Sequence, residues 1–188
     1  MKNVVIGICS GDMVHADFAF TLFNMGMFST VVHRQDHRIL GVINRKTSVI
    51  HFGRNEVVKE AQGIKDATHL LMVDTDMTIP PSALANLLNH NKPIVGIQAS
   101  TKRKPYKLTA RQEDGKWMVG GGVLLVEMEV FKKLAFPWFA APYDEQGNIT
   151  GEDIYFCRKA WAAGIPVECD LELSKHIGHI GQDIYGVK

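Results

Sequence analysis

The sequence predicts an α/β protein with a Rossmann-like, mostly parallel sheet flanked by helices and a small antiparallel part. Short apolar runs alternate with helical patterns through the first hundred residues, as in sheets built from strand–helix–strand units. The runs end at turn-forming or polar residues, which is typical of strands buried on both faces. The 188 residues are 46% hydrophobic and 22% charged, enough for a substantial core. We therefore expect residues 1–188 to form a single domain with two halves, 1–100 and 101–188.

The first half opens with an apolar run at residues 4–8 that ends at "SGD" and predicts the first strand. A helix is predicted at residues 13–27, because Val14, Phe18, Leu22 and Met25 recur at helical spacing. The remaining patterns predict strands at 30–33, 68–73 and 93–98, and helices at 53–64 and 80–88, the last with proline in its first turn. Residues 44–50 are mixed and predict a loop or a strand end.

The second half has shorter and more irregular elements. Strands are predicted at residues 106–111, 116–119 and 122–126, and "QEDGKW" is typical of a hairpin turn. A short helix at 127–134 precedes an irregular aromatic stretch at 136–148. A helix at 150–164 and a strand at 166–169 complete the pattern. We expect Trp138 and Phe139, in the irregular stretch, to pack in the core.

The charge balance excludes one class of function. A formal net charge of +1 argues against a nucleic-acid binder that depends on a broad basic field. The only dense basic cluster is Lys102-Arg103-Lys104 with Lys107, and a solvated loop is the favoured interpretation of it.

The cysteines and the N-terminus indicate a cytoplasmic protein. Cys9, Cys157 and Cys169 share no metal-type spacing, so we expect reduced, packed thiols. "MKNVVIGICSGD" has only a short apolar run before a turn, which favours a first strand over a signal peptide. No stretch approaches the roughly 20 apolar residues of a membrane span.

Two carboxylates follow the predicted strand at 68–73, in "THLLMVDTDM". Ligands of open parallel sheets bind outside the carboxyl ends of the strands, and alternation would place Asp74 and Asp76 on one side with Thr75 opposite. Two such carboxylates can hold Mg²⁺ or Mn²⁺ and, through it, a diphosphate. The structural alternative is that Asp76 begins a turn and caps the helix at Pro80.

The surrounding order of motifs resembles family 2-type glycosyltransferases of the GT-A fold. "GRNEVV" opens a helix ahead of the strand that ends in Asp-x-Asp, although Gly53 stands where alanine is commoner. "VGGGVLLVE" resembles the strand that lines the donor pocket. "GEDIYFCRKAW" resembles the Glu-Asp helix, and "LSKHIGHIG" the terminal metal-binding histidine. The resemblance covers residues 3–181 and is strongest to short bacterial or phage-type members, which lack a long C-terminal acceptor extension.

The resemblance implies a metal-dependent, inverting transfer of a sugar from a UDP- or GDP-sugar to an acceptor hydroxyl. It implies that Mn²⁺ or Mg²⁺ is held by Asp74, Asp76 and His179, with His176 as a competing choice. Asp153 is then the candidate base, and Glu152 binds donor or acceptor. The residues implied in donor binding are Ser10, Asp12, Arg54, Asp74, Thr75, Gly121 and Gly122.

Each of these assignments has a structural alternative. Thr150 and Asp153 have the spacing of a capping box, and Asp12 could cap the helix predicted from Met13. Arg54 could form a surface salt bridge. The functional interpretation of Asp153 differs from a capping box. A carboxylate in the first turn of a helix is kept ionised by the helix dipole and can accept a proton from an attacking hydroxyl.

Two other classes of protein remain as rivals. A sugar nucleotidyltransferase would carry a glycine-rich, basic phosphate loop after the first strand, whereas "CSGDMVH" has one glycine and no lysine or arginine. A non-catalytic nucleotide-sugar or glycan-binding module would keep the Asp pair without needing Asp153. The short second half is also compatible with a homo-oligomer in which a partner chain completes the site.

Overall fold

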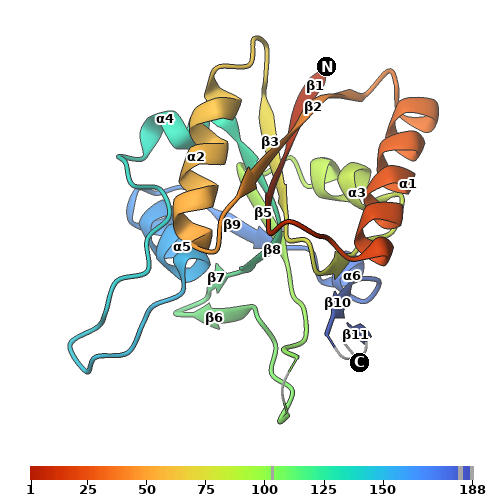
Figure 1. Cartoon of the computed structure of the whole chain (residues 1–188). Coiled ribbons are helices and arrows are strands. Elements are labelled where there is room, and N and C mark those ends of the chain that lie inside the picture. Colours follow the sequence, from red (N-terminus) through yellow and green to blue (C-terminus); the bar gives the residue numbers. More distant parts are fainter. Residues whose placement is uncertain (103, 182–183, 187–188) are drawn as a thin grey trace.

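A six-stranded sheet forms the centre of the part of the chain that the computed structural model describes, residues 1–102, 104–181 and 184–186 (Figure 1). Its strands lie in the order β2-β1-β3-β8-β5-β9. Every neighbouring pair is parallel except the two pairs made by β8. The bounds are β1 (Lys2–Ser10), β2 (His37–Lys46), β3 (His69–Val73), β5 (Ile94–Ile97), β8 (Gly120–Glu127) and β9 (Val167–Cys169). The predicted fold class is therefore confirmed.

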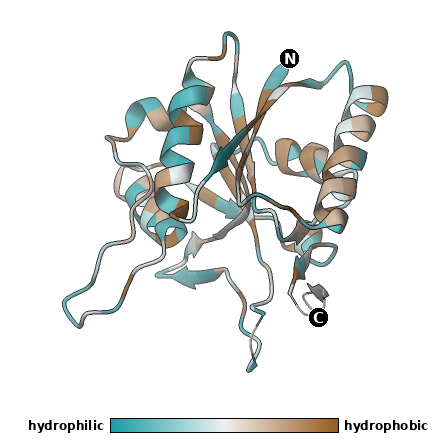
Figure 2. Cartoon of the chain, viewed as in Figure 1, coloured by the Kyte–Doolittle hydropathy of each residue, from teal (hydrophilic) through white to brown (hydrophobic). Residues whose placement is uncertain are grey.

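Helices cover both faces of this sheet. One face packs against α2 (Ile50–Gln62), α4 (Met128–Lys133) and α5 (Glu152–Ala162); the other packs against α1 (Ala16–Val32), α3 (Ala83–Asn89) and α6 (Leu171–Ser174). Successive side chains along a strand point to opposite faces of the sheet, so each strand contributes to the hydrophobic core on both faces. Val5 faces the first set of helices, while Val4 and Ile6 face the second. Figure 2 shows the central strands as the most hydrophobic part of the interior.

Among the described residues, no helix is long and apolar enough to cross a bilayer. Two small antiparallel sheets complete the fold, as predicted. One joins β10 (Gly178–Ile180) to β4 (Met77–Thr78) and β11 (Ile184–Gly186). In the other, β6 (Arg111–Glu113) and β7 (Lys116–Met118) form the hairpin expected from "QEDGKW". Its turn residues Asp114 and Gly115 both have positive φ, 50° and 73°, the conformation that Asp-Gly favours in a two-residue hairpin loop.

The strand predicted at residues 30–33 is wrong. These residues form the last turn of α1 and its C-cap, His33, whereas the second strand is β2. β2 is an edge strand of the sheet, and its exposed Arg38, Arg45 and Lys46 hide the apolar pattern of a buried strand. Helical continuation from α1 thus outweighs the local preference of Thr30 and Val31 for a strand.

Other boundaries also differ from the prediction: α1 spans Ala16–Val32 where 13–27 is predicted, and α2 spans Ile50–Gln62 where 53–64 is predicted. The helix expected from Pro80 begins at Ala83, after both prolines and Ser82. The strand expected at residues 106–111 is wrong except for its last residue, because β6 starts at Arg111 and Leu108 forms only an isolated bridge with Ser100. Hydrogen bonds between Thr101 and Lys107 close the intervening segment into a loop instead.

Asn55, on α2, connects this helix to the irregular aromatic stretch. Its side-chain oxygen accepts from the amides of Trp138 and Phe139, at 3.1 Å each, and its Nδ2 donates to the Phe139 carbonyl at 2.7 Å. Trp138 and Phe139 are buried, which confirms their predicted place in the core. Removing a side chain that satisfies several buried backbone groups leaves those groups without partners.

We therefore expect Asn55→Ala to lower the free energy of unfolding by about 2–3 kcal/mol, measured by urea denaturation. Asn86→Ala on α3 is the matched control, because Asn86 donates a single long hydrogen bond of 3.5 Å to Ser82. A loss at Asn55 no larger than the loss at Asn86 would contradict the role of Asn55.

His69, the first residue of β3, makes the stability of the fold depend on pH. Burial lowers the pKa of His69 to about 4, and the nearby Lys2 acts in the same direction. An unfolded histidine has a pKa of about 6.5, so the unfolded chain binds a proton there before the folded protein does. Stability therefore falls as the pH drops below about 6.5, and this contribution levels off below about 4.

We expect wild-type stability to fall by about 1–2 kcal/mol between pH 7 and pH 5 from this group, and His69→Gln to remove that part of the slope. Denaturant titrations at several pH values measure it. The control replaces the exposed His176 and should leave the slope unchanged; an equal slope in wild type and His69→Gln would disprove the assignment.

Candidate active site

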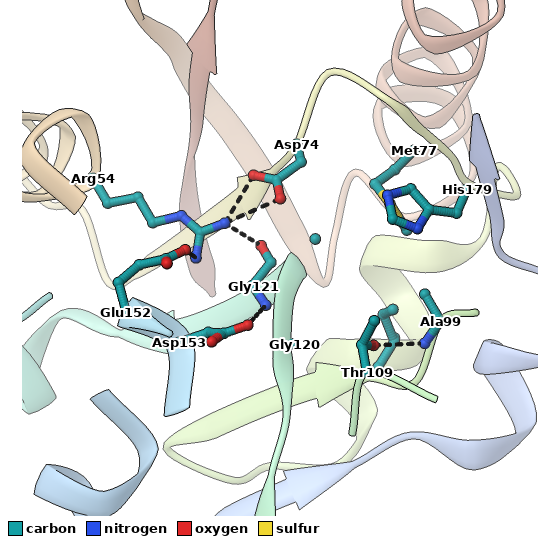
Figure 3. Close-up of a pocket in the computed structure, with 12 residues that line it drawn as sticks. Arg54, Asp74, Met77, Ala99, Thr109, Gly120, Gly121, Glu152, Asp153 and His179 are labelled. Carbon is teal, nitrogen blue, oxygen red and sulfur yellow. Dashed lines mark hydrogen bonds and ion pairs between the residues drawn. The ribbon is translucent and has the colours of Figure 1, made fainter. Parts of the chain in front are cut away.

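A cavity of about 190 Å³ lies where β3 ends, β8 begins and α5 starts (Figure 3). Because β8 runs antiparallel to β3, its glycine-rich start lies beside the carboxyl end of β3, and the Asp74 amide donates to the Gly122 carbonyl at 2.9 Å. Among the predicted site residues, those that line the cavity are Arg54, Asp74, Gly121, Gly122, Glu152, Asp153 and His179. Segments far apart in the sequence thus meet at one edge of the sheet.

Arg54 is the buried centre of the site. Its Nη2 donates to both oxygens of Asp74, at 2.8 and 3.1 Å, and to the Gly121 carbonyl at 3.1 Å. Its Nη1 lies 3.0 Å from Oε1 of Glu152. The side chain is only 3% exposed, so the proposed alternative of a surface salt bridge is wrong.

Gly121 is required by the position of this guanidinium. A Cβ atom at Gly121 would lie 1.7 Å from Nη1 of Arg54, so the guanidinium would have to leave its contacts with Asp74 and Glu152 to make room for it. The "GGG" motif therefore provides room for Arg54 to reach Asp74 and Glu152.

The electrostatics of this cluster favour a cationic Arg54. Burial would lower the pKa of Arg54, but the carboxylates of Asp74 and Glu152 outweigh it and raise the pKa above the usual value. Burial raises the pKa of Glu152, and Arg54 opposes this rise. Nε and Nη1 of Arg54 make no aligned hydrogen bond within the described part of the chain, so the guanidinium retains donors that an anionic group could use.

Asp153 is held against the start of β8. Its Oδ2 accepts from the Gly121 amide at 3.1 Å, and its Oδ1 accepts from the Ile154 amide at 2.7 Å. The N-cap of α5 is Gly151, which has no side-chain cap, so the capping-box alternative is wrong. The carboxylate instead faces the cavity beside Gly120 and Gly121 (Figure 3).

Asp74 and Asp76 do not lie on one side of an extended chain, as alternation had predicted. The chain turns directly after β3, and the Met77 amide donates to the Asp74 carbonyl at 3.2 Å. Asp74 faces Arg54, whereas Asp76 pairs with Lys102 and has its Oδ1 3.6 Å from Nε2 of His179. Asp76 does not cap α3 either, because Ser82 is the N-cap of that helix.

His179, and not His176, reaches the cavity. β10 pairs with β4 so that His179 lies opposite Met77, and the Ile180 amide donates to the Asp76 carbonyl at 2.6 Å. Nδ1 of His179 donates to the Ser100 carbonyl at 2.8 Å, which leaves Nε2 directed toward Asp76. His176 is exposed.

Asp76 and His179 each stabilise the charged form of the other. Burial would raise the pKa of Asp76, but His179 and Lys102 outweigh it and lower the pKa to about 2. Burial would lower the pKa of His179, but the Asp76 carboxylate and the Ser100 carbonyl raise it.

The donor atoms fit part of a divalent-cation site. Among the described residues, Oδ1 of Asp76 is buried without a hydrogen-bond partner. Nδ1 of His179 donates to a carbonyl, so a cation that displaces the proton of Nε2 would meet an oriented lone pair, as in metal-binding histidines. Asp74 is already bonded to Arg54. Among the described side chains, no three His, Cys, Asp or Glu residues gather as a metal cluster, so two protein ligands are the set that fits.

Ser10, Asp12 and Thr75 lie outside the 190 Å³ cavity. Ser10 is buried at the end of β1, and its hydroxyl donates to the Gly11 carbonyl. Asp12 is exposed and forms an ion pair with Lys46 at 3.1 Å. It does not cap α1, whose N-cap is His15. Thr75 lines a neighbouring hollow of about 420 Å³ together with Asp76, Lys102 and the segment 13–15.

Sequence reasoning missed two residues at the site. Lys102 was assigned to a solvated loop, yet it pairs with Asp76; Arg103 lies outside the described residues. Thr109 lines the cavity, and its Oγ1 accepts from the Ala99 amide at 3.0 Å. Nothing in the local pattern marks either residue, because both approach the site only through the loop between β5 and β6.

The cysteines behave as the sequence predicts. All three are free thiols, and Cys157 and Cys169 are buried. Burial raises the pKa of Cys9 to about 11 and the pKa values of Cys157 and Cys169 to about 12. Cys9 packs directly beneath Gly53, where a Cβ would lie 2.8 Å from its sulfur.

No family model and no curated protein sequence matches this chain. Solved structures do. One match is A197 from STIV, with a TM-score of 0.61, 15% sequence identity, and coverage of 100% of this chain and 95% of that one. Another is a mutant of Drosophila β-1,4-galactosyltransferase 7 in complex with manganese, UDP-Gal and xylobiose. Its TM-score is 0.55 and its identity 16%, with coverage of 100% and 71% of the two chains.

These similarities, together with the sheet order, define the fold. The chain has the GT-A glycosyltransferase fold. At 15–16% identity the comparisons establish the fold, and the activity has to be argued from the site.

Proposed function

We propose that this protein is a metal-dependent glycosyltransferase that moves a sugar from a nucleotide-diphosphate sugar, UDP- or GDP-linked, to an acceptor hydroxyl with inversion. The observation that carries the proposal is the grouping of Asp74, Glu152 and Asp153 with Arg54 at one cavity, beside the pair of Asp76 and His179, at the edge of a GT-A sheet. A structural ion-pair network would not need a buried Oδ1 on Asp76 that lacks a hydrogen-bond partner among the described residues, or a carboxylate at Asp153 that faces a cavity.

The charge of the site supports a divalent cation. Four carboxylates face Arg54 and Lys102, and His179 is a third cation when it is protonated, so an anionic diphosphate would still meet a surplus of negative charge. In this proposal Asp76 and His179 hold Mn²⁺ or Mg²⁺, with Asp74 positioned by Arg54 at the side of the cation. When bound, the metal would supply Lewis-acid stabilisation of the leaving diphosphate. The structural neighbour β-1,4-galactosyltransferase 7 is a complex with manganese and UDP-Gal, which supports a metal ion and a nucleotide-sugar donor in this proposal.

The remaining residues then have separate tasks. Asp153, oriented by the Gly121 and Ile154 amides, accepts the proton of the attacking acceptor hydroxyl. Glu152, fixed by Arg54, binds the hydroxyls of donor or acceptor. The hollow beside Thr75 and Lys102, next to Ser10 and Asp12 in the chain, takes the nucleoside and its phosphates. The backbone of Gly121 and Gly122, which lines the cavity, contacts the donor.

The test is a panel of nucleotide sugars, each assayed with and without Mn²⁺ or Mg²⁺, for binding by calorimetry and for release of the nucleoside diphosphate. We expect metal-dependent binding of one donor class and release that increases with an acceptor. Asp76→Ala should weaken metal-dependent donor binding at least about tenfold, whereas Glu129→Ala, in an exposed surface pair, should not.

Two results would count against this function. Binding of no nucleotide sugar under any metal condition would reject the donor site altogether. Metal-dependent binding without any release of nucleoside diphosphate, even with an acceptor panel, would favour a non-catalytic nucleotide-sugar-binding module.

A further inference from the structure

Helix α1 is apolar on almost every side, yet the protein covers only one of them. Its 17 residues contain a single charged side chain, Asp17, and only Phe18, Met25 and Ser29 are buried. Phe20, Phe23 and Val31 are 69%, 64% and 67% exposed. A helix that is hydrophobic all round is normally enclosed, so a cover for this helix is missing from the isolated chain. Figure 2 shows α1 as a largely apolar helix on the outside of the molecule.

A groove runs along this helix. It has a volume of about 560 Å³ and lies between α1 and the edge strand β2, lined on the helix by Phe23, Gly26 and Met27 and on the strand by Ile39 and Val42. Val42 is itself 56% exposed. The apolar surface is thus continuous from the helix to the sheet edge, which distinguishes it from scattered exposed side chains.

Gly26, which lines the same groove, adds a further observation. It lies in the middle of α1, where glycine costs roughly 1 kcal/mol relative to alanine. A Cβ atom at this position would meet nothing within 4 Å, so no contact among the described residues requires glycine. A glycine at an open helical position is explained when another backbone approaches it from outside.

We infer that this surface binds a second copy of the same chain through an antiparallel pair of α1 helices. Phe20, Phe23, Met27 and Val31 follow one another at spacings of three, four and four residues, the stripe that packs against another helix. Around a two-fold axis near Gly26, Phe23 meets the partner's Met27 and Phe20 meets the partner's Val31. The same patch serves both chains, as a two-fold interface requires.

The size and chemistry of the patch agree with a protein partner. The large apolar side chains that α1 and β2 expose there are Phe20, Phe23, Met27, Val31, Val32 and Val42. Together they expose on the order of 600 Å², at the lower end of what each partner buries in a standard interface. A lipid surface fits less well, because helices that lie in a membrane interface are rich in lysine and arginine, and α1 has neither.

Sedimentation velocity of the full chain over a range of concentrations tests this inference, which does not depend on the proposed function. We expect a species of twice the 20.9-kDa mass of the chain. Phe23→Glu should weaken association by at least about thirtyfold, without unfolding the monomer, because Phe23 is 64% exposed. The control is Tyr143→Glu, at an equally exposed site (71%) remote from α1 in the sequence and absent from the groove, which should leave association intact.

Gly26→Leu separates association from folding. Leucine is the better helix former, and its Cβ would meet nothing within 4 Å among the described residues, so thermal stability of the monomer should rise or stay equal while self-association weakens by about tenfold or more. A protein that stays monomeric at all concentrations overturns the inference. So does a dimer that is unaffected by both Phe23→Glu and Gly26→Leu, or a monomer that instead binds anionic phospholipid vesicles through Phe23.

Discussion

Arg54→Met is expected to lower the free energy of unfolding by about 3–5 kcal/mol at pH 7, the loss typical of breaking a buried ion pair by removing one partner. The guanidinium is 3% exposed and lies between Asp74 and Glu152. Methionine fills much of its volume but leaves two carboxylates in a buried site without a cation. Chemical denaturation measures the loss.

The pH dependence of this loss identifies its cause. As the pH falls, Glu152, whose pKa is already raised by burial, takes up a proton and no longer needs a cation, so the deficit of Arg54→Met should shrink in acid. Arg45→Met is the matched control, because Arg45 and Glu60 form a half-exposed pair worth at most about 1 kcal/mol. A deficit at Arg54 as small as that at Arg45 would show that the cluster does not support the fold.

Asp153→Asn is expected to reduce turnover by about 10²–10⁴-fold, the usual contribution of a general base, while donor binding changes little. The asparagine oxygen can still accept from the Gly121 amide, but the side chain can no longer take a proton. The amide nitrogen of the asparagine then takes the place of Oδ1, which accepts a hydrogen bond from the Ile154 amide in the wild type. Because two donors then face each other, we also expect a stability loss of about 1 kcal/mol.

Glu152→Gln is the matched comparison on the same helical turn. Because Glu152 is paired with Arg54, this variant should mainly raise KM, with a smaller effect on kcat than Asp153→Asn. Stability measurements on both variants exclude unfolding as the cause of lost activity. Full turnover by Asp153→Asn, or a larger loss of kcat in Glu152→Gln, would move the role of base away from Asp153.

The secondary structure that could be predicted is the part with strong local patterns. Buried strands such as β1 and β3 are continuous apolar runs, and α2 and α5 carry clear helical stripes. The errors in the predicted secondary structure lie where solvent exposure or contacts with a neighbouring segment determine the conformation. β2 is an exposed edge strand with charged residues, and the 106–111 segment is held as a loop by Thr101 and Lys107.

The candidate site could be predicted as a set of residue types but not as an arrangement. The order of Arg54, Asp74, the glycines, Glu152, Asp153 and His179 is visible in the printed sequence. That Asp74 and Asp76 diverge, with Arg54 between Asp74 and Glu152, depends on a turn after β3. A pattern of two carboxylates one residue apart is the same whether the chain stays extended or turns.

The sequence by itself determined the α/β class, the strand that ends at the Asp pair and the helix that starts with Glu152 and Asp153, because these depend on the local periodicity of apolar residues. Only the tertiary structure decided that β8 enters the sheet antiparallel between β3 and β5. This placement brings Gly121 against Arg54 and Asp153, and it leaves Lys102 and His179 beside Asp76. Contacts between residues far apart in the chain follow from packing, and no local pattern records them.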